Sequence, residues 1–153
     1  MKEGDWMGEI TKSIEIEASP EKVFAFMTDL EKMNEITKGV EEAEYTSKGP
    51  IGVGTTKHVV GKAGRFKEES NFEITEFVKD RKVRWRTIGA SRVKMNVTQS
   101  FEPTAKGTKL TVTNDYEPPY SILGKLVDKI MIHKNAEKNM ERTLKNMKKA
   151  LEG

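Results

Sequence analysis

Residues 14–24, Ile-Glu-Ile-Glu-Ala-Ser-Pro-Glu-Lys-Val-Phe, change from one kind of pattern to another within a few positions. Up to residue 17 the apolar side chains alternate with polar ones, and this period of two predicts a half-buried strand over residues 8–17. Ser19 is a good helix N-cap, and Pro20 suits the first helical position. The stretch therefore predicts a strand that leads directly into a helix.

Two short helices are expected after this first strand. Val23, Phe24 and Met27 recur at helical spacing and predict the first of them. Asp29 is a suitable N-cap for the second, and Gly39 is a suitable residue to end it.

The remainder of the chain predicts a series of strands and then one long helix. Alternating segments are separated by turn residues such as Gly, Pro and Asp, which is typical of an antiparallel meander. Apolar residues then recur at intervals of three and four, without an internal proline, as in an amphipathic helix. The expected strands cover residues 40–47, 55–61, 65–78, 83–88, 93–101 and 110–116, and the expected helix covers residues 121–151.

This order of elements predicts an α+β fold, with an antiparallel sheet and its helices gathered on one side. The long helix would span about 45 Å at 1.5 Å per residue, more than the width of a small core. A helix laid diagonally across a bent sheet does not fill the hollow everywhere. The sequence therefore predicts an apolar cavity of the kind that usually binds small molecules.

The composition excludes several classes of protein. Cys 0 excludes disulfides and a thiolate nucleophile, and His 2 nearly excludes a multi-histidine metal centre. No apolar run approaches the roughly 18 residues of a membrane span, and the start MKEGDWMGEI lacks a secretory signal. We expect a flexible leader over residues 1–7, in which Met7 is an alternative start, and one domain over residues 8–153. We expect it in the cytoplasm, with no metal and no cofactor.

The charge is nearly balanced, with Lys+Arg 27 against Asp+Glu 24 and a net charge of +3. The excess of basic residues lies in the last helix, where acidic residues are interleaved with them. This pattern is typical of a solvated helix face, and the alternative is contact with an anionic membrane surface or RNA. We expect no nucleic-acid partner and no stable membrane insertion, and transient membrane-surface contact remains open. Monomer and dimer also both remain open.

The opening stretch resembles that of the START-like (SRPBCC) superfamily, which includes the birch-pollen allergen relatives. There, an apolar strand is followed by Ala-x-Pro-x-x-Val-aromatic, as in residues 18–24. The sequence is also similar to that of the family at residues 52–55, 74–77 and 107–112. Within the superfamily, it most resembles the polyketide cyclase/dehydrase-like and coenzyme Q-binding-like branch. The resemblance implies a helix-grip fold, in which a bent seven-stranded antiparallel sheet wraps around the C-terminal helix. Many relatives carry a Trp in the second short helix, where this chain has Met33-Asn34.

The alternation predicts which side chains line the cavity, and the alternative for each is ordinary core packing. Trp85 and Tyr116 also carry polar groups that need a partner when buried. A backbone carbonyl is the expected partner, and a ligand group is the alternative. The candidate ligand-binding residues are Met27, Met33, Ile36, His58, Phe72, Trp85, Thr87, Met95, Val97, Val112, Tyr116, Leu126, Ile130 and His133.

Three of the titratable residues are candidates for acid–base chemistry. His58 and His133 are the only imidazoles, and a pair meeting in the cavity would suit proton transfer. Glu68 shares a predicted face with Phe72, where burial would disfavour its charged form. For the two histidines, the alternative is a structural role. For Glu68, the alternatives are an ion pair with Arg65 or Arg86 and a position at a solvent-exposed strand end. We find no nucleophile or phosphate-binding motif, so no catalytic residue is assigned.

These observations favour a protein that binds a hydrophobic small molecule, such as a lipid, polyketide or quinone, as a carrier or sensor. Binding is favoured over catalysis. One alternative is an enzyme of the polyketide cyclase or dehydratase type that uses polar cavity residues. The other is a protein-interaction module of the chaperone-activator type, which the superfamily also contains.

Overall fold

Seven antiparallel strands form one sheet in the order β1-β7-β6-β5-β4-β3-β2. The computed structural model describes residues 8–63, 66–91, 93–117 and 126–153, and within these ranges the side chains of residues 63, 66 and 126–132 are outside the description. The predicted α+β class and seven-stranded sheet are confirmed. The strands are β1 Gly8–Ile16, β2 Val40–Tyr45, β3 Thr56–Ala63, β4 Phe66–Val78, β5 Lys82–Ile88, β6 Lys94–Pro103 and β7 Thr108–Glu117.

Two short helices connect β1 to β2, as the sequence predicts. They are α1, Pro20–Met27, and α2, Leu30–Ile36. The Ser19 hydroxyl accepts a hydrogen bond from the Lys22 backbone N–H at 3.3 Å, and Asp29 accepts one from Lys32 at 3.2 Å. Both expected caps are therefore present, and each satisfies a backbone donor that the first helical turn leaves unpaired.

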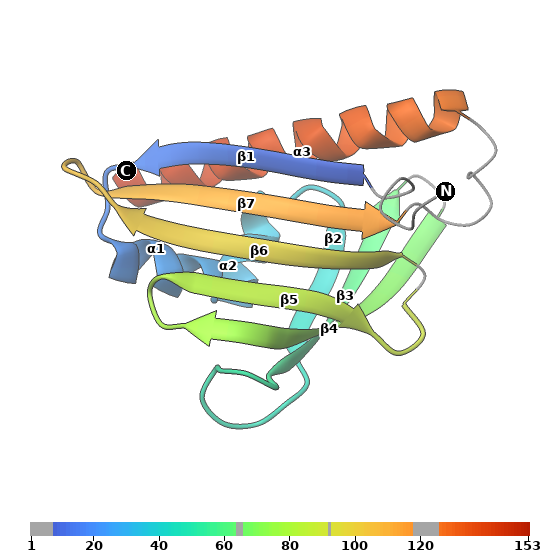
Figure 1. Cartoon of the computed structure of the whole chain (residues 1–153), viewed down its shortest axis with the longest axis horizontal. Coiled ribbons are helices and arrows are strands. Elements are labelled where there is room, and N and C mark those ends of the chain that lie inside the picture. The colour runs from blue at the N-terminus through green and yellow to red at the C-terminus, as the bar shows by residue number, and fades with distance from the viewer. Residues whose placement is uncertain (1–7, 64–65, 92, 118–125) are drawn as a thin grey trace.

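The long helix α3, Leu126–Glu152, ends the chain. Its expected start at residue 121 lies outside the described residues. Within the described part of the chain, no helix is both long enough and apolar enough to span a membrane. In Figure 1, α3 runs behind the strands β1 and β7, and the sheet curls so that β2 and β3 lie behind β4 to β6.

The opening stretch is attached to the β6–β7 hairpin by a close backbone approach. The Thr108 hydroxyl is fully buried and donates to the Ala18 carbonyl at 2.7 Å. A Cβ atom at Gly107 would collide with the backbone of Ile16 and Ala18. This contact holds the turn between β1 and α1 against the start of β7.

The core is densest at the end of the sheet that α1 covers. Phe24 of α1 packs edge-on against Phe101 and Phe77, with ring centroids 5.5 and 5.8 Å apart. Leu144 and Met147 of α3 are buried in the same cluster. These contacts place α1 and the C-terminal half of α3 on one face of the sheet, which we call the inner face.

Candidate functional site

Strand register assigns two neighbouring rows of residues to the inner face, away from the dense end of the core. One row runs from Tyr116 through Met95, Thr87 and Phe72 to Lys57, and the next contains Asn114, Val97 and Trp85. Cross-strand partners share a face, so these side chains all point to the same side. The inner-face site is defined here as Lys57, Phe72, Trp85, Thr87, Met95, Val97, Asn114 and Tyr116.

Burial differs between the two ends of the inner face. Phe101 and Leu110, at the dense end, are 1% and 0% exposed. At the inner-face site Phe72, Trp85 and Tyr116 are buried, whereas the side chains of Met95 and Val97 are only half-buried. The site is therefore an apolar surface on which part of the side-chain area stays accessible.

Seven of the predicted residues lie on this face together. Phe72, Trp85, Thr87, Met95, Val97 and Tyr116 belong to the site, and Val112 lies on the same face nearer the core, where it is 7% exposed. That they contact a ligand remains a prediction.

The predicted residues of the helices have different positions. Met27 is buried in the core cluster, and Met33 and Ile36 are half-buried against it. The Asn146 side chain donates to the Ile36 carbonyl at 3.1 Å and joins α2 to α3. Leu126 and Ile130 lie in α3, but their side chains are outside the described residues.

His58 is not part of the site, which corrects the expectation from sequence. It pairs in register with Asn71, and its Nδ1 atom lies 2.8 Å from the Asn71 side-chain oxygen. Its neighbour Lys57 pairs with Phe72 and takes the inner face instead. The two histidines therefore do not meet, since His58 lies against Asn71 and His133 against Tyr116.

Glu68 lies two pleats along β4 from Phe72, so it does share the inner face. It is half-buried and pairs in register with Gly61, near the start of β4. Neither of the expected arginine partners is seen with it, since Arg65 is outside the described residues and no ion pair with Arg86 is formed.

Lys57 is the residue that sequence reasoning missed. Its ammonium nitrogen lies 4.1 Å from the ring centroid of Trp85 and 5.3 Å from that of Phe72. Burial among these rings lowers the Lys57 pKa to about 8. The available signal was the alternation with His58, but the sequence did not show which of the two points inward.

Tyr116 contacts α3 through a side chain, which corrects the expectation of a backbone partner. Its hydroxyl lies 2.9 Å from His133 Nδ1, and the two rings are stacked with centroids 6.2 Å apart. Burial raises the pKa of Tyr116. The His133 Nε2 atom is 3.5 Å from a Glu137 oxygen, and Lys12 forms ion pairs with Glu137 and Glu141 at 3.0 and 2.8 Å. A continuous polar chain thus joins β7, α3 and β1 beside the site.

Asn114 adds a further polar atom to the site. Its side-chain oxygen is buried and has no hydrogen-bond partner among the described residues. The Thr87 hydroxyl, by contrast, accepts a hydrogen bond from the Met95 backbone N–H at 3.0 Å. The site thus combines an apolar surface with one cation, one acceptor and the Tyr116–His133 pair.

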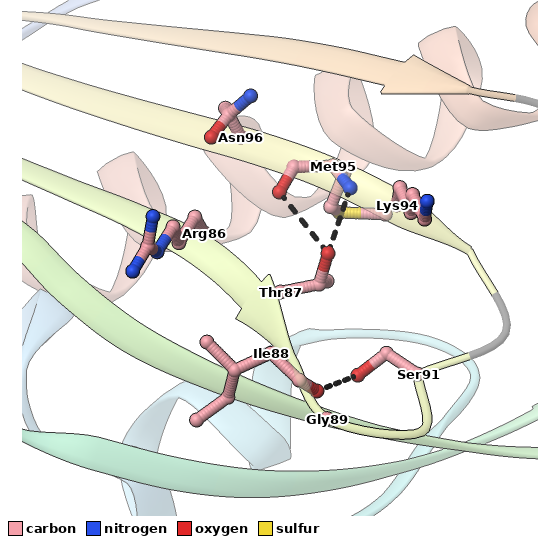
Figure 2. A pocket seen from close by; sticks show the side chains of 8 residues that line it. All are labelled: Arg86, Thr87, Ile88, Gly89, Ser91, Lys94, Met95 and Asn96. Atoms are coloured by element: carbon pink, nitrogen blue, oxygen red, sulfur yellow. Dashed lines mark hydrogen bonds between the residues drawn. The ribbon is translucent and has the colours of Figure 1, made fainter.

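A surface pocket of about 210 Å³ adjoins the site where β5 ends and β6 begins (Figure 2). Thr87 and Met95 belong both to this pocket and to the inner-face site. The Ser91 hydroxyl closes the turn by donating to the Ile88 carbonyl at 2.7 Å, as Figure 2 shows. The pocket is lined by Arg86, Thr87, Ile88, Gly89, Ser91, Lys94, Met95 and Asn96.

Comparison with known proteins gives consistent matches along almost the whole chain. The model of the family described as polyketide cyclase/dehydrase and lipid transport matches residues 7–152. A relative in Streptomyces lincolnensis, named as an uncharacterized 17.2 kDa protein in the melC2-rnhH intergenic region, is 26% identical over 137 residues. These are 89% of this chain and 87% of that protein.

Several solved structures have the same fold as this chain. The chain resembles TTHA0849 from Thermus thermophilus with a TM-score of 0.80 and 26% identity, over 94% of this chain and 97% of that one. It resembles the Zhui aromatase/cyclase from Streptomyces sp. R1128 with a TM-score of 0.74 and 16% identity, over 95% and 94% of the two chains. At that identity the second likeness concerns the fold alone.

Proposed function

The chain belongs to the polyketide cyclase/dehydrase and lipid transport family, and we propose that it binds a hydrophobic small molecule at the inner-face site, as a carrier or sensor. The family description and the aromatase/cyclase neighbour suggest either hydrophobic ligand binding or a cyclase-type role. The inner-face site would supply an apolar surface for such a ligand, on the face of the sheet where α3 also lies.

The observation that carries the proposal is the difference in burial along the inner face. Phe101 and Leu110 are sealed by α1 and α3, whereas Met95 and Val97 pack at the margin of the same core cluster and are only half-buried. Transfer of apolar area from water contributes about 25 cal/mol per Å², so an apolar ligand would gain free energy by covering these side chains.

Titration with the neutral fluorescent probe Nile red tests the proposal. The wild-type protein is expected to enhance its fluorescence saturably. Met95→Arg places a charge in the site and is expected to reduce the affinity at least tenfold. Val53→Arg, at a position that is 71% exposed, is the matched control and should bind as the wild type does.

A second variant separates loss of binding from loss of folding. Val97→Phe fills the space without adding charge, and its helix and sheet content is checked by circular dichroism. Folded Met95→Arg and Val97→Phe proteins that bind Nile red with wild-type affinity would contradict the proposed site.

A second candidate function is acid–base catalysis of the cyclase or dehydratase type. The Tyr116–His133 hydrogen bond favours it, because a phenol and an imidazole in contact are suited to move a proton. Turnover of a poly-β-ketone substrate that is lost in both Tyr116→Phe and His133→Gln, with Nile red binding retained, would support this function. The absence of turnover in the wild-type protein would count against it.

A further inference from the structure

Two lysines lie on the inner face among the described residues, and they differ in their surroundings. Lys12 forms ion pairs with Glu137 and Glu141, at 3.0 and 2.8 Å. Lys57 forms none, since no carboxylate of the described residues lies within 4.0 Å of its nitrogen. Its ammonium group lies instead over the faces of Trp85 and Phe72.

Two polar groups in the same cross-strand row as Lys57 already have other partners. Tyr45 lies directly opposite in the register, and its hydroxyl donates to the Thr28 carbonyl at 2.7 Å. The Thr87 hydroxyl, in the same row, is occupied by the Met95 backbone. An ammonium group has three donors, and no acceptor for them is found in the described part of the chain.

The aromatic rings compensate this charge only in part. Lys57 is half-buried, and a cation over a ring face gains less than desolvation of the ion costs. The lowered pKa of Lys57 agrees with an incomplete compensation. A lysine that bears this cost beside an accessible apolar surface has the position of a ligand-binding group.

We propose that Lys57 binds the anionic head group of an amphipathic ligand, so that the natural ligand carries a carboxylate at the end that reaches β3. The carboxylate forms an ion pair with the ammonium, and the apolar body of the ligand covers the half-buried Val97 and Met95. A ligand with a cationic head is repelled from the same position. This inference rests on the proposed function and adds the ligand's charge and orientation to it.

Two probes of equal chain length test the inference, dodecanoate and 1-dodecanol, each measured at pH 7 by displacement of Nile red. The wild-type protein is expected to bind dodecanoate at least tenfold more tightly than dodecanol, because hydrogen bonds to a charged group are the stronger ones. Lys57→Met is expected to lose this preference and to bind dodecanol within about threefold of the wild type. Lys57→Arg keeps the charge and is expected to retain a preference for dodecanoate.

Lys109→Met is the matched control, since it removes the same charge from an exposed position of β7 on the opposite face. It should leave both affinities unchanged. Equal binding of the two probes by the wild type, or an unchanged preference in Lys57→Met, would overturn the role of Lys57 while the proposed function stands. Failure of the wild type to bind either probe or Nile red would instead contradict the proposed function itself.

Discussion

Tyr116 on β7 and His133 on α3 are joined by a 2.9 Å hydrogen bond between the phenol oxygen and Nδ1. This bond attaches the long helix to the sheet at the edge of the inner-face site. The ion pairs of Lys12 with Glu137 and Glu141 attach the same helix one strand further along. Among the described side chains, polar contacts join α3 to this part of the sheet, whereas the buried Leu144 and Met147 hold its C-terminal half.

Removal of the Tyr116–His133 bond should weaken the protein measurably. Tyr116→Phe and His133→Ala are each expected to lower the free energy of unfolding by about 1 kcal/mol. The double variant should cost less than the sum of the two, which urea denaturation of all four proteins would show. Strict additivity would indicate that the bond contributes nothing to stability.

Lys57→Met is expected to stabilise the protein at pH 7, by about 1 kcal/mol, because it removes a desolvated charge. Groups that serve binding often lower stability in this way. Denaturation of the ligand-free protein measures the change, and Lys109→Met again serves as the control for the lost charge. A Lys57→Met protein that is less stable than the wild type would favour a structural role for the cation over the rings.

The same lysine predicts a pH dependence above neutrality. Its pKa of about 8 in the folded protein lies below the usual 10.5, so the unfolded chain binds more protons between these values. The stability of the wild type should rise with pH across this window relative to that of Lys57→Met. Tyr45, the group opposite, has a pKa raised to about 12 by burial and stays neutral there. A constant difference between the two proteins from pH 8 to 10.5 would contradict this prediction.

An acid-sensitive contribution is expected from Glu141. Its hydrogen bond to Lys12 lowers the pKa of the carboxyl from the usual 4.5, so the stabilisation is complete above that value and is lost as the pH falls through the lowered pKa. Glu141→Gln should therefore reduce the slope of stability against pH below about 4.5, measured by chemical denaturation. Glu102→Gln, exposed on β6, is the control, and equal slopes in both variants would exclude the effect.

Gly107 tests the attachment of the opening stretch to β7. A Cβ atom there would collide with the Ile16 carbonyl and the backbone of Ala18, so Gly107→Ala should lower the free energy of unfolding by about 1–3 kcal/mol. Gly52→Ala is the matched control, since its Cβ would meet no atom within 4 Å. Thermal denaturation of the two variants should separate them, and similar melting temperatures would show that the approach is not tight in solution.

The elements were predictable because their signals are local. The caps at Ser19 and Asp29 lie where the sequence predicts them, since a side chain that accepts from a backbone N–H three residues later needs no distant partner. The alternation of β5 to β7 likewise placed Trp85, Val97 and Tyr116 on one face. The inward-facing residues of β3 were predicted wrongly. Lys57 and His58 are adjacent and both polar, so the alternation of apolar and polar residues does not show which of them points inward. Only the pairing of β3 with β4 shows that it is Lys57.

The order of strands and helices, the caps and the apolar periodicity determined the class of fold, since each of them is a property of neighbouring residues in the chain. The tertiary structure alone decided that Lys57 lies over Trp85 and that Tyr116 meets His133, because these pairs join residues from separate elements. Their contacts depend on strand register and on the position of α3. A shift of one residue in register would turn Lys57 to the opposite face and bring His58 inward.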